Sequence, residues 1–139
     1  MRVVWMLRQA LNLIVTVAVL SLLSGCLLMS GETTSIDLQG DSGNLNTSFV
    51  SAEGVSERTV RVAEGVASVQ VITMVAIESG DLTFELLDPE GAVVFSVASR
   101  PDGQVTRSSM VLTDINGEVR YRVKASGARN GNFQIFFQR

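Results

Sequence analysis

The stretch Glu118-Val-Arg-Tyr-Arg-Val-Lys-Ala125 alternates strictly between charged and apolar residues. Successive side chains of a β-strand point to opposite faces, so this period of two is typical of a strand with one buried and one solvated face. The inward set would be Val119, Tyr121, Val123 and Ala125. This stretch therefore predicts a strand that lies over a hydrophobic core.

A second segment, residues 81–98, contains two alternating runs on either side of Asp88-Pro89-Glu90-Gly91. Asp at the first position, Pro at the second and Gly at the fourth are typical of a type I turn. The segment therefore predicts a β-hairpin. Its inward residues would be Leu82, Phe84 and Leu86 on the first strand and Val93, Phe95 and Val97 on the second.

The remaining strand signals have the same period. They lie at residues 57–63, 68–78 and 104–113, the last with a bulge near Ser108-Ser109, and at Phe133, Ile135 and Phe137. Residues 68–78 are apolar on both faces, which favours a central strand or one covered on both sides. Turns are expected at Ser79-Gly80, at Asn130-Gly131 and, as a type I′ hairpin, at Asn116-Gly117.

No stretch after Cys26 has a sustained helical period. The sequence therefore predicts an all-β domain, an antiparallel β-sandwich of about seven or eight strands. The run Gly80-Asp-Leu-Thr-Phe-Glu-Leu-Leu-Asp-Pro-Glu-Gly91, followed by Tyr121-Arg-Val-Lys-Ala-Ser-Gly127 and Gly131-Asn-Phe-Gln-Ile135, resembles the pre-peptidase C-terminal domains of secreted bacterial proteases. The resemblance covers about residues 57–138 and implies a jelly-roll fold. The chain departs from the pattern at the acidic positions that bind calcium in some relatives, and we expect no attached protease.

The first 25 residues have the three parts of a secretory signal. Arg2 and Arg8 precede an apolar run over residues 10–23, and Ser24-Gly25 supplies small residues for cleavage. The segment Leu23-Ser24-Gly25-Cys26 resembles the lipobox of bacterial lipoproteins. This resemblance implies cleavage between Gly25 and Cys26 and diacylation of the Cys26 thiol, so that acyl chains anchor the protein in a membrane. The alternatives are an uncleaved membrane helix over residues 10–29 and an ordinary buried cysteine.

Residues 26–47 are rich in Ser, Thr, Gly and Asn, and they predict a flexible tether with a short strand at residues 35–38. The β-sandwich would then occupy residues 48–139. A flexible segment of this length reaches roughly 25 Å, which would hold the domain near the lipid without pressing it into the lipid. By family resemblance an Asp after the lipidated Cys retains lipoproteins at the inner membrane. Leu27 stands there, which favours the outer membrane of a two-membrane cell and a periplasmic or extracellular domain.

The composition excludes several kinds of function. The chain contains no His, so Ser–His and Cys–His nucleophilic sites and zinc sites of the usual Cys/His kind are excluded. Without Arg2 and Arg8, nine basic residues face fourteen acidic ones, a side-chain charge of about −5 that does not favour nucleic acid. We expect neither enzymatic activity nor a cofactor.

Arg120, Arg122 and Lys124 form a basic row on the outer face of the strand at residues 118–125. Gln134 and Gln138 would join it across the next hairpin. Such a row fits an anionic polysaccharide or a lipid headgroup, although a solvated outer sheet face produces the same pattern.

The loops carry carboxylates that could in principle gather around a calcium ion or act as a glycosidase pair. They are Asp81, Asp88, Glu90, Asp102 and Asp114. Turn capping explains Asp88 and Asp114 more economically, and no dense ligand loop is present, so no metal site is assigned. Aromatic residues that could stack on sugars are few, because the single Trp, Trp5, is removed with the signal.

The leading hypothesis is a non-enzymatic, lipid-anchored β-sandwich of the bacterial cell envelope. It would act as an interaction or structural module toward an envelope protein or glycan and would be attached to the membrane through acyl chains on Cys26. The alternative is a module that binds carbohydrate or peptide, with calcium dependence as a variant of it.

Overall fold

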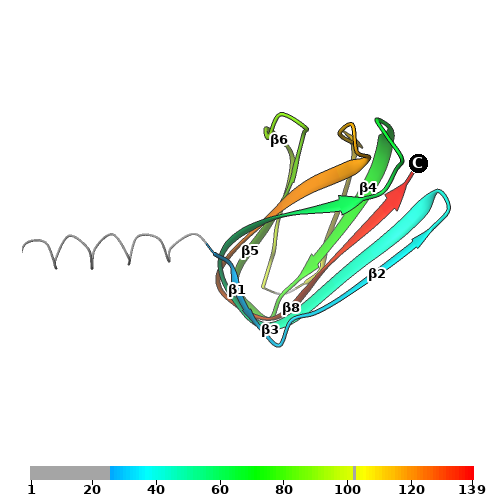
Figure 1. Ribbon diagram of the computed structural model, residues 1–139. Helices are drawn as coiled ribbons and strands as arrows, with labels where there is room; N and C mark the ends of the chain where they lie inside the picture. The colour runs from blue at the N-terminus through cyan, green and yellow to red at the C-terminus, as the bar shows by residue number, and fades with distance from the viewer. Residues whose placement is uncertain (1–25, 102) are drawn as a thin grey trace, which may run out of the picture.

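The computed structural model describes residues 26–101 and 103–139, and strands make up most of them (Figure 1). All strand pairs are antiparallel. The predicted all-β class is confirmed. The strands are β1 (Leu28–Ser30), β2 (Thr33–Gln39), β3 (Ser42–Arg61), β4 (Ser68–Ala76), β5 (Ser79–Leu87), β6 (Val93–Ala98), β7 (Val105–Leu112) and β8 (Glu118–Gln138). In this part of the chain no helix is long and apolar enough to cross a membrane.

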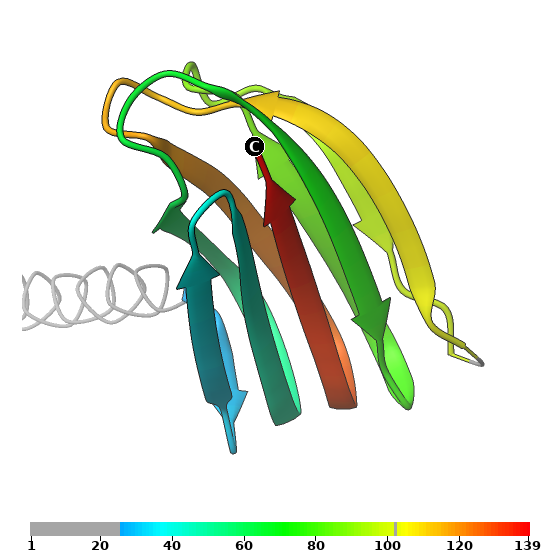
Figure 2. The ribbon, with the colours of Figure 1, turned by 90° about the vertical axis from the view of Figure 1, so that its right-hand side faces the viewer.

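The strands form two packed layers, which we call A and B. Two long strands, β3 and β8, run through both layers. Residues 42–49 of β3 pair with residues 131–138 of β8, and β2, β4 and β7 complete this layer B in the order β2-β3-β8-β4-β7. Residues 54–61 of β3 pair with residues 118–125 of β8, and β5 and β6 complete layer A in the order β3-β8-β5-β6. The sheet thus folds over on itself into the two layers of a jelly-roll sandwich, as Figures 1 and 2 show.

The fold-over occurs at irregular points in β3 and β8. The register of β3 shifts between Ala52 and Gly54, and Gly127 and Asn130 of β8 have positive φ angles of 57° and 45°. Such irregularities bend a strand and increase its twist. The turn predicted at Asn130-Gly131 is wrong, because β8 bends there without reversing direction.

The inner faces of the two layers enclose the hydrophobic core. Phe84 of layer A packs 5.4 Å from Tyr121 and 5.9 Å from Phe133 between ring centroids, so aromatic contacts join the layers. The inward residues that alternation predicts for β5 and β8 are all buried, and so are three residues on the inner face of β4: Leu82, Phe84, Leu86, Val119, Tyr121, Val123, Ala125, Phe133, Ile135 and Phe137, with Val69, Val71 and Val75 of β4. Alternation therefore identified most of the core correctly.

The type I′ hairpin predicted at Asn116-Gly117 is wrong. β7 ends in layer B and β8 begins in layer A, so the chain crosses between layers and the two strands do not pair. The carboxylate of Asp114 organises this crossing by accepting hydrogen bonds from the backbone N–H groups of Asn116 (2.8 Å) and Glu118 (3.0 Å).

Two details of the edge strands also differ from the predictions. Leu86 pairs with Phe95 and Leu87 with Val93, and the resulting bulge turns Val93 outward instead of inward. The bulge predicted at Ser108-Ser109 is absent, because β7 keeps one register along β4. β4 is central in layer B, as predicted, although its outer face is half-buried and not covered.

The flexible tether predicted for residues 26–47 is not found. β1, β2 and the start of β3 lie in this range, and the domain begins close to Cys26. All seven residues of β2 are exposed, since β2 is an edge strand held by backbone pairing to β3. The short strand predicted at residues 35–38 is confirmed as part of β2, but its full length and its pairing with β3 were not expected, because hydrophobic periodicity detects buried faces.

Candidate functional site

The outer face of layer B carries a group of amide side chains around one aromatic ring. Strand register sets Asn44, Phe136 and Ile72 in one row across β3, β8 and β4. A neighbouring row contains Asn46 and Gln134. We call this surface the amide face; its members are Asn44, Asn46, Gln70, Ile72, Gln134, Phe136 and Gln138, with Asp37, Gln39 and Ser42 at its edge.

The same alternation that builds the core places these side chains outside it. Phe133, Ile135 and Phe137 point into the core, so the intervening Gln134 and Phe136 point to the outer face. On β3, buried Leu45 and Thr47 likewise alternate with half-buried Asn44 and Asn46. The polar face is thus a direct consequence of the strand geometry.

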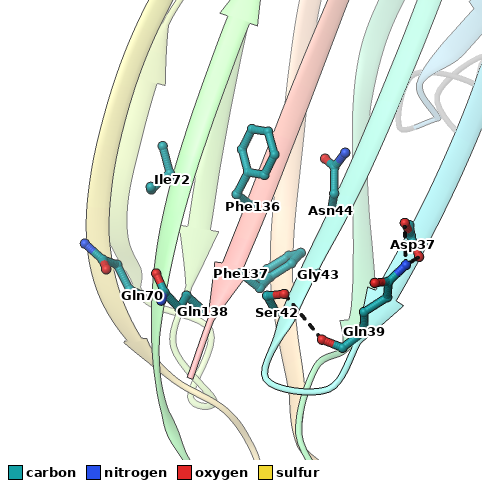
Figure 3. A pocket seen from close by; sticks show the side chains of 10 residues that line it. All are labelled: Asp37, Gln39, Ser42, Gly43, Asn44, Gln70, Ile72, Phe136, Phe137 and Gln138. Carbon is teal, nitrogen blue, oxygen red and sulfur yellow. Dashed lines mark hydrogen bonds between the residues drawn. The ribbon is translucent and has the colours of Figure 1, made fainter.

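The amide face contains a hollow of about 480 Å³. Figure 3 shows Ile72, Phe136 and Asn44 pointing to the same side of the sheet above Gln70 and Gln138. Among the ten residues that line the hollow, Asp37 is the only charged one. The hollow is therefore polar but almost uncharged.

The amides on this face are only partly satisfied by one another. The Gln134 side chain donates to Oδ1 of Asn44 at 3.0 Å, while Oδ1 of Asn46 is buried without a hydrogen-bond partner in the described residues. An amide carries two N–H donors and a carbonyl acceptor, so the amides that line the hollow, Asn44, Gln70 and Gln138, retain capacity for a ligand. The Phe136 ring is half-buried and offers an apolar surface beside them.

This combination suits an uncharged ligand that carries many hydroxyl groups. Hydroxyls both donate and accept hydrogen bonds, as amides do, and the apolar face of a sugar ring can lie on an aromatic ring. Neighbouring strands are about 4.8 Å apart, so the row from β2 to β4 spans roughly 15 Å. That width accommodates a short stretch of an extended chain.

The structure brings the predicted basic row together on layer A but neutralises most of it. Arg122 donates to Glu57 through Nε at 2.9 Å and to Glu85 through Nη1 at 3.1 Å, and Lys124 donates to Glu85 at 2.7 Å. Arg120 lies half-buried beside Gly91. The predicted extension through Gln134 and Gln138 is not on this face, because both lie in layer B.

Glu85 is buried in this ion-pair row, with a side chain that is 10% exposed. Burial alone would raise its pKa, but the hydrogen bonds and charges of Lys124 and then Arg122 outweigh it and lower the pKa below the ordinary 4.5. A carboxyl whose pKa is lower in the folded state stabilises the fold above its unfolded pKa, and this contribution is lost as the pH falls through the folded value.

We therefore expect acid to destabilise the wild type partly through Glu85. Glu85→Gln should lower the free energy of unfolding by about 1–2 kcal/mol at pH 7, because the amide keeps only one acceptor oxygen and removes the negative charge that Lys124 and Arg122 face. Between pH 5 and pH 3 the variant should lose less stability than the wild type. Urea unfolding at several pH values measures both effects, and parallel pH profiles would show that Glu85 contributes no such linkage.

The loop carboxylates do not gather into one site. Oδ1 of Asp88 accepts a hydrogen bond from the backbone N–H of Ala92 at 2.7 Å and so caps its turn, as Asp114 does at the β7–β8 crossing. Asp88, Glu90 and Asp114 line one groove, but residues 26–101 and 103–139 contain no group of three or more Cys, Asp or Glu residues close enough to hold a metal ion. Asp102 and Gly25 lie outside the described residues, and Cys26 is exposed with a free thiol.

The amide face was missed in the sequence, although part of its signal is there. The polar residues of β3 and β8 alternate with core residues and could have been recognised as outward-facing. Their meeting depends on pairing between segments about ninety residues apart, such as Asn44 with Phe136, which alternation within each segment does not specify.

Comparisons with known proteins found no matching family model and no matching curated protein. Among solved structures, the chain is similar to a carbohydrate-binding module of Cellvibrio mixtus lichenase 5A in complex with cellotriose. The identity is 20%, the TM-score is 0.39, and 81% of this chain and 89% of that one are covered. It is also similar to a Bacillus endospore appendage protein (10%, TM-score 0.47, coverage 81% and 93%) and to a xylan-binding domain of Paenibacillus barcinonensis Xyn10C (13%, TM-score 0.40, coverage 81% and 83%).

Proposed function

We propose that this protein is a non-enzymatic binding module of a bacterial cell envelope that binds an uncharged glycan on its amide face. The observation that carries the proposal is the row Asn44, Phe136 and Ile72 with the surrounding amides on one side of layer B. These groups supply paired donors and acceptors beside a half-buried aromatic ring.

The electrostatics of the two outer faces favour a neutral ligand over an anionic one. The hollow on layer B is lined by one charged residue, Asp37. On layer A, Arg122 and Lys124 are held by Glu57 and Glu85. An anion binding there would have to compete with these carboxylates, and its affinity would fall as salt screens the exposed charges.

Calorimetric titration with a panel of neutral oligosaccharides tests the proposal. The panel should include β-1,4-, β-1,3- and α-1,6-linked glucans and xylan. Phe136→Ala should weaken binding of the active sugar about tenfold, because the lost aromatic contact is worth about 1.4 kcal/mol. Asn44→Ala should also weaken it.

Arg120→Gln on layer A is the matched control and should bind as the wild type does. Affinity that depends on Arg120 and not on Phe136 would assign the ligand to the basic row instead. If no member of the panel bound, the glycan proposal would be wrong, and the protein would be better described as an interaction or structural module.

We further propose that acyl chains on Cys26 hold the module in the membrane, with the outer membrane favoured in a two-membrane cell. The lipobox sequence Leu23-Ser24-Gly25-Cys26 supports the anchor, and the exposed thiol of Cys26 is compatible with it. Two or more acyl chains give stable attachment where one alone is marginal.

Metabolic labelling with a fatty-acid analogue tests the anchor directly. The wild type should carry the label, and Cys26→Ser should carry none, because the serine hydroxyl does not replace the thiol in this modification. Equal thermal stability of the two proteins would show that folding is unaffected. Equal labelling, or no label on the wild type, would argue against lipidation.

A further inference from the structure

The residues that follow Cys26 are fixed to the domain. β1 pairs with β3 through Leu28–Glu53, Met29–Ala52 and Ser30–Ser51, at the point where β3 bends. Leu27 and Met29 pack against the core. Gly54 has a φ of 104°, and a Cβ there would collide with the backbone carbonyl of Cys26, so the chain passes directly over this glycine. We call residues 26–32 the N-terminal strap.

The far end of the N-terminal strap is held by an ion pair to layer A. Glu32 accepts hydrogen bonds from both terminal nitrogens of Arg58, at 2.6 and 3.3 Å. The side chains of both residues are about one-third exposed, and a two-pronged contact between guanidinium and carboxylate restricts direction as well as distance. The strap is therefore attached to β3 on both sides of the bend.

The surface around Cys26 exposes two apolar side chains, Leu28 and Val55, beside their charged and exposed register partners Glu53 and Lys124. Leu28, two residues away, is 71% exposed, and Val55 is 36% exposed. Cys26, Leu27, Val55, Ser56 and Glu57 line a common hollow, and the one charged member, Glu57, is paired with Arg122. In the sequence, the apolar run of residues 10–23 ends three residues before Cys26. A bilayer that holds either acyl chains on Cys26 or the apolar run itself must lie beside this surface.

We infer that the bend of the sandwich rests on the lipid, with Leu28 and Val55 in the boundary between headgroups and acyl chains. The inference rests on the proposed anchor and replaces the loose attachment that a tether would give. Leu27 alone separates Cys26 from β1, so the lipid surface lies within a few ångströms of Leu28.

This contact fixes the orientation of the amide face. From Glu53 at the bend to Ser42, where β3 begins, the strand covers roughly 35 Å. Ser42 and Gln39 border the hollow of the amide face. The ligand site is thus held away from the anchoring membrane, toward the compartment into which the domain projects.

A single tryptophan can locate the lipid. The chain has one Trp, Trp5, which cleavage of the signal removes, and Trp5→Phe removes its emission from any chain that keeps the segment. In that background Leu28→Trp places a probe on the N-terminal strap. Leu112→Trp is the matched control. Leu112 is the last residue of β7 in layer B, is 57% exposed, and lines the groove beside the Asp88 turn, which lies at the end of layer A away from the bend. Both full-length proteins are purified from membranes and reconstituted into phosphatidylcholine vesicles with brominated acyl chains.

We expect Leu28→Trp to lose about half of its emission or more, because side chains roughly 5–10 Å into the boundary lie near the bromines. Leu112→Trp should keep its emission. Flotation of the vesicles separates the two proposals. Protein that fails to float refutes the anchor and the inference with it. Protein that floats with an unquenched Leu28→Trp, or with the two probes quenched equally, leaves the anchor standing and overturns the docking at the bend.

Discussion

Phe84→Ala should lower the free energy of unfolding by about 3–5 kcal/mol, the usual cost of removing a large buried aromatic side chain. Phe84 is completely buried and contacts the rings of Tyr121 and Phe133 between the layers. The cavity would open where the two layers meet, and strand pairing on either side limits how far the backbone can move to fill it. Urea unfolding followed by circular dichroism measures the loss as a lower midpoint.

Phe136→Ala is the matched control for this experiment. Phe136 is the same residue type, but it lies half-buried on the outer face of layer B. Its removal should cost less than about 1.5 kcal/mol, because it leaves no enclosed cavity. If both variants lost the same stability, Phe136 would be a structural residue. Weaker sugar binding by Phe136→Ala could then not be assigned to the loss of a contact with the ligand.

Predictions that depend on one segment at a time were the most successful. Alternation identified the inward residues of β5 and β8, and the hairpin of β5 and β6 is present with the predicted turn, in which the N–H of Gly91 donates to the carbonyl of Asp88 at 3.0 Å. These features are local, since the side chains of neighbouring residues decide which face is buried and which turn forms.

Predictions that depend on how segments meet were less successful. The two strands expected around Asn130-Gly131 are one strand that bends, and the expected hairpin at Asn116-Gly117 is a crossing between layers. Turn-forming residues also serve bends and crossings, because all three require unusual φ angles or local capping. Only the strand pairing distinguishes a turn from a bend or a crossing. β8 pairs with β3 along most of its length, with β5 in its first part and with β4 in its last part.

The predictions for the candidate site succeeded and failed for the same reasons. Arg120, Arg122 and Lys124 were correctly placed on one outer face, but Glu57 and Glu85, which neutralise two of them, come from β3 and β5. The amide face likewise joins residues of distant strands. A site assembled across strands needs the sheet order, and that order is set by the long bent strands that the sequence presents as separate pieces.

Gly80→Ala tests the bend that joins the layers. It should lower the free energy of unfolding by at least about 3 kcal/mol. Gly80 has a φ of 82°, and a Cβ there would overlap the backbone carbonyl of Gly127 and lie 2.7 Å from the N–H nitrogen of Ala128. Neither neighbour can yield easily, because Ser79 and Asp81 pair with β8 on both sides of this point. A left-handed conformation in a residue with a side chain costs about 1–2 kcal/mol, and the backbone collision adds to it.

Gly127→Ala separates the two contributions. Gly127 has a φ of 57° in the same bend, but a Cβ there would meet no atom within 4 Å. Gly127→Ala should therefore lower the free energy of unfolding only by the conformational cost, about 1–2 kcal/mol. Equal losses in the two variants would mean that the close approach of β5 and β8 tolerates a side chain. A much larger loss for Gly80→Ala would show that backbone contact at this glycine holds the two halves of β8 at the angle on which both layers, and therefore the amide face, depend.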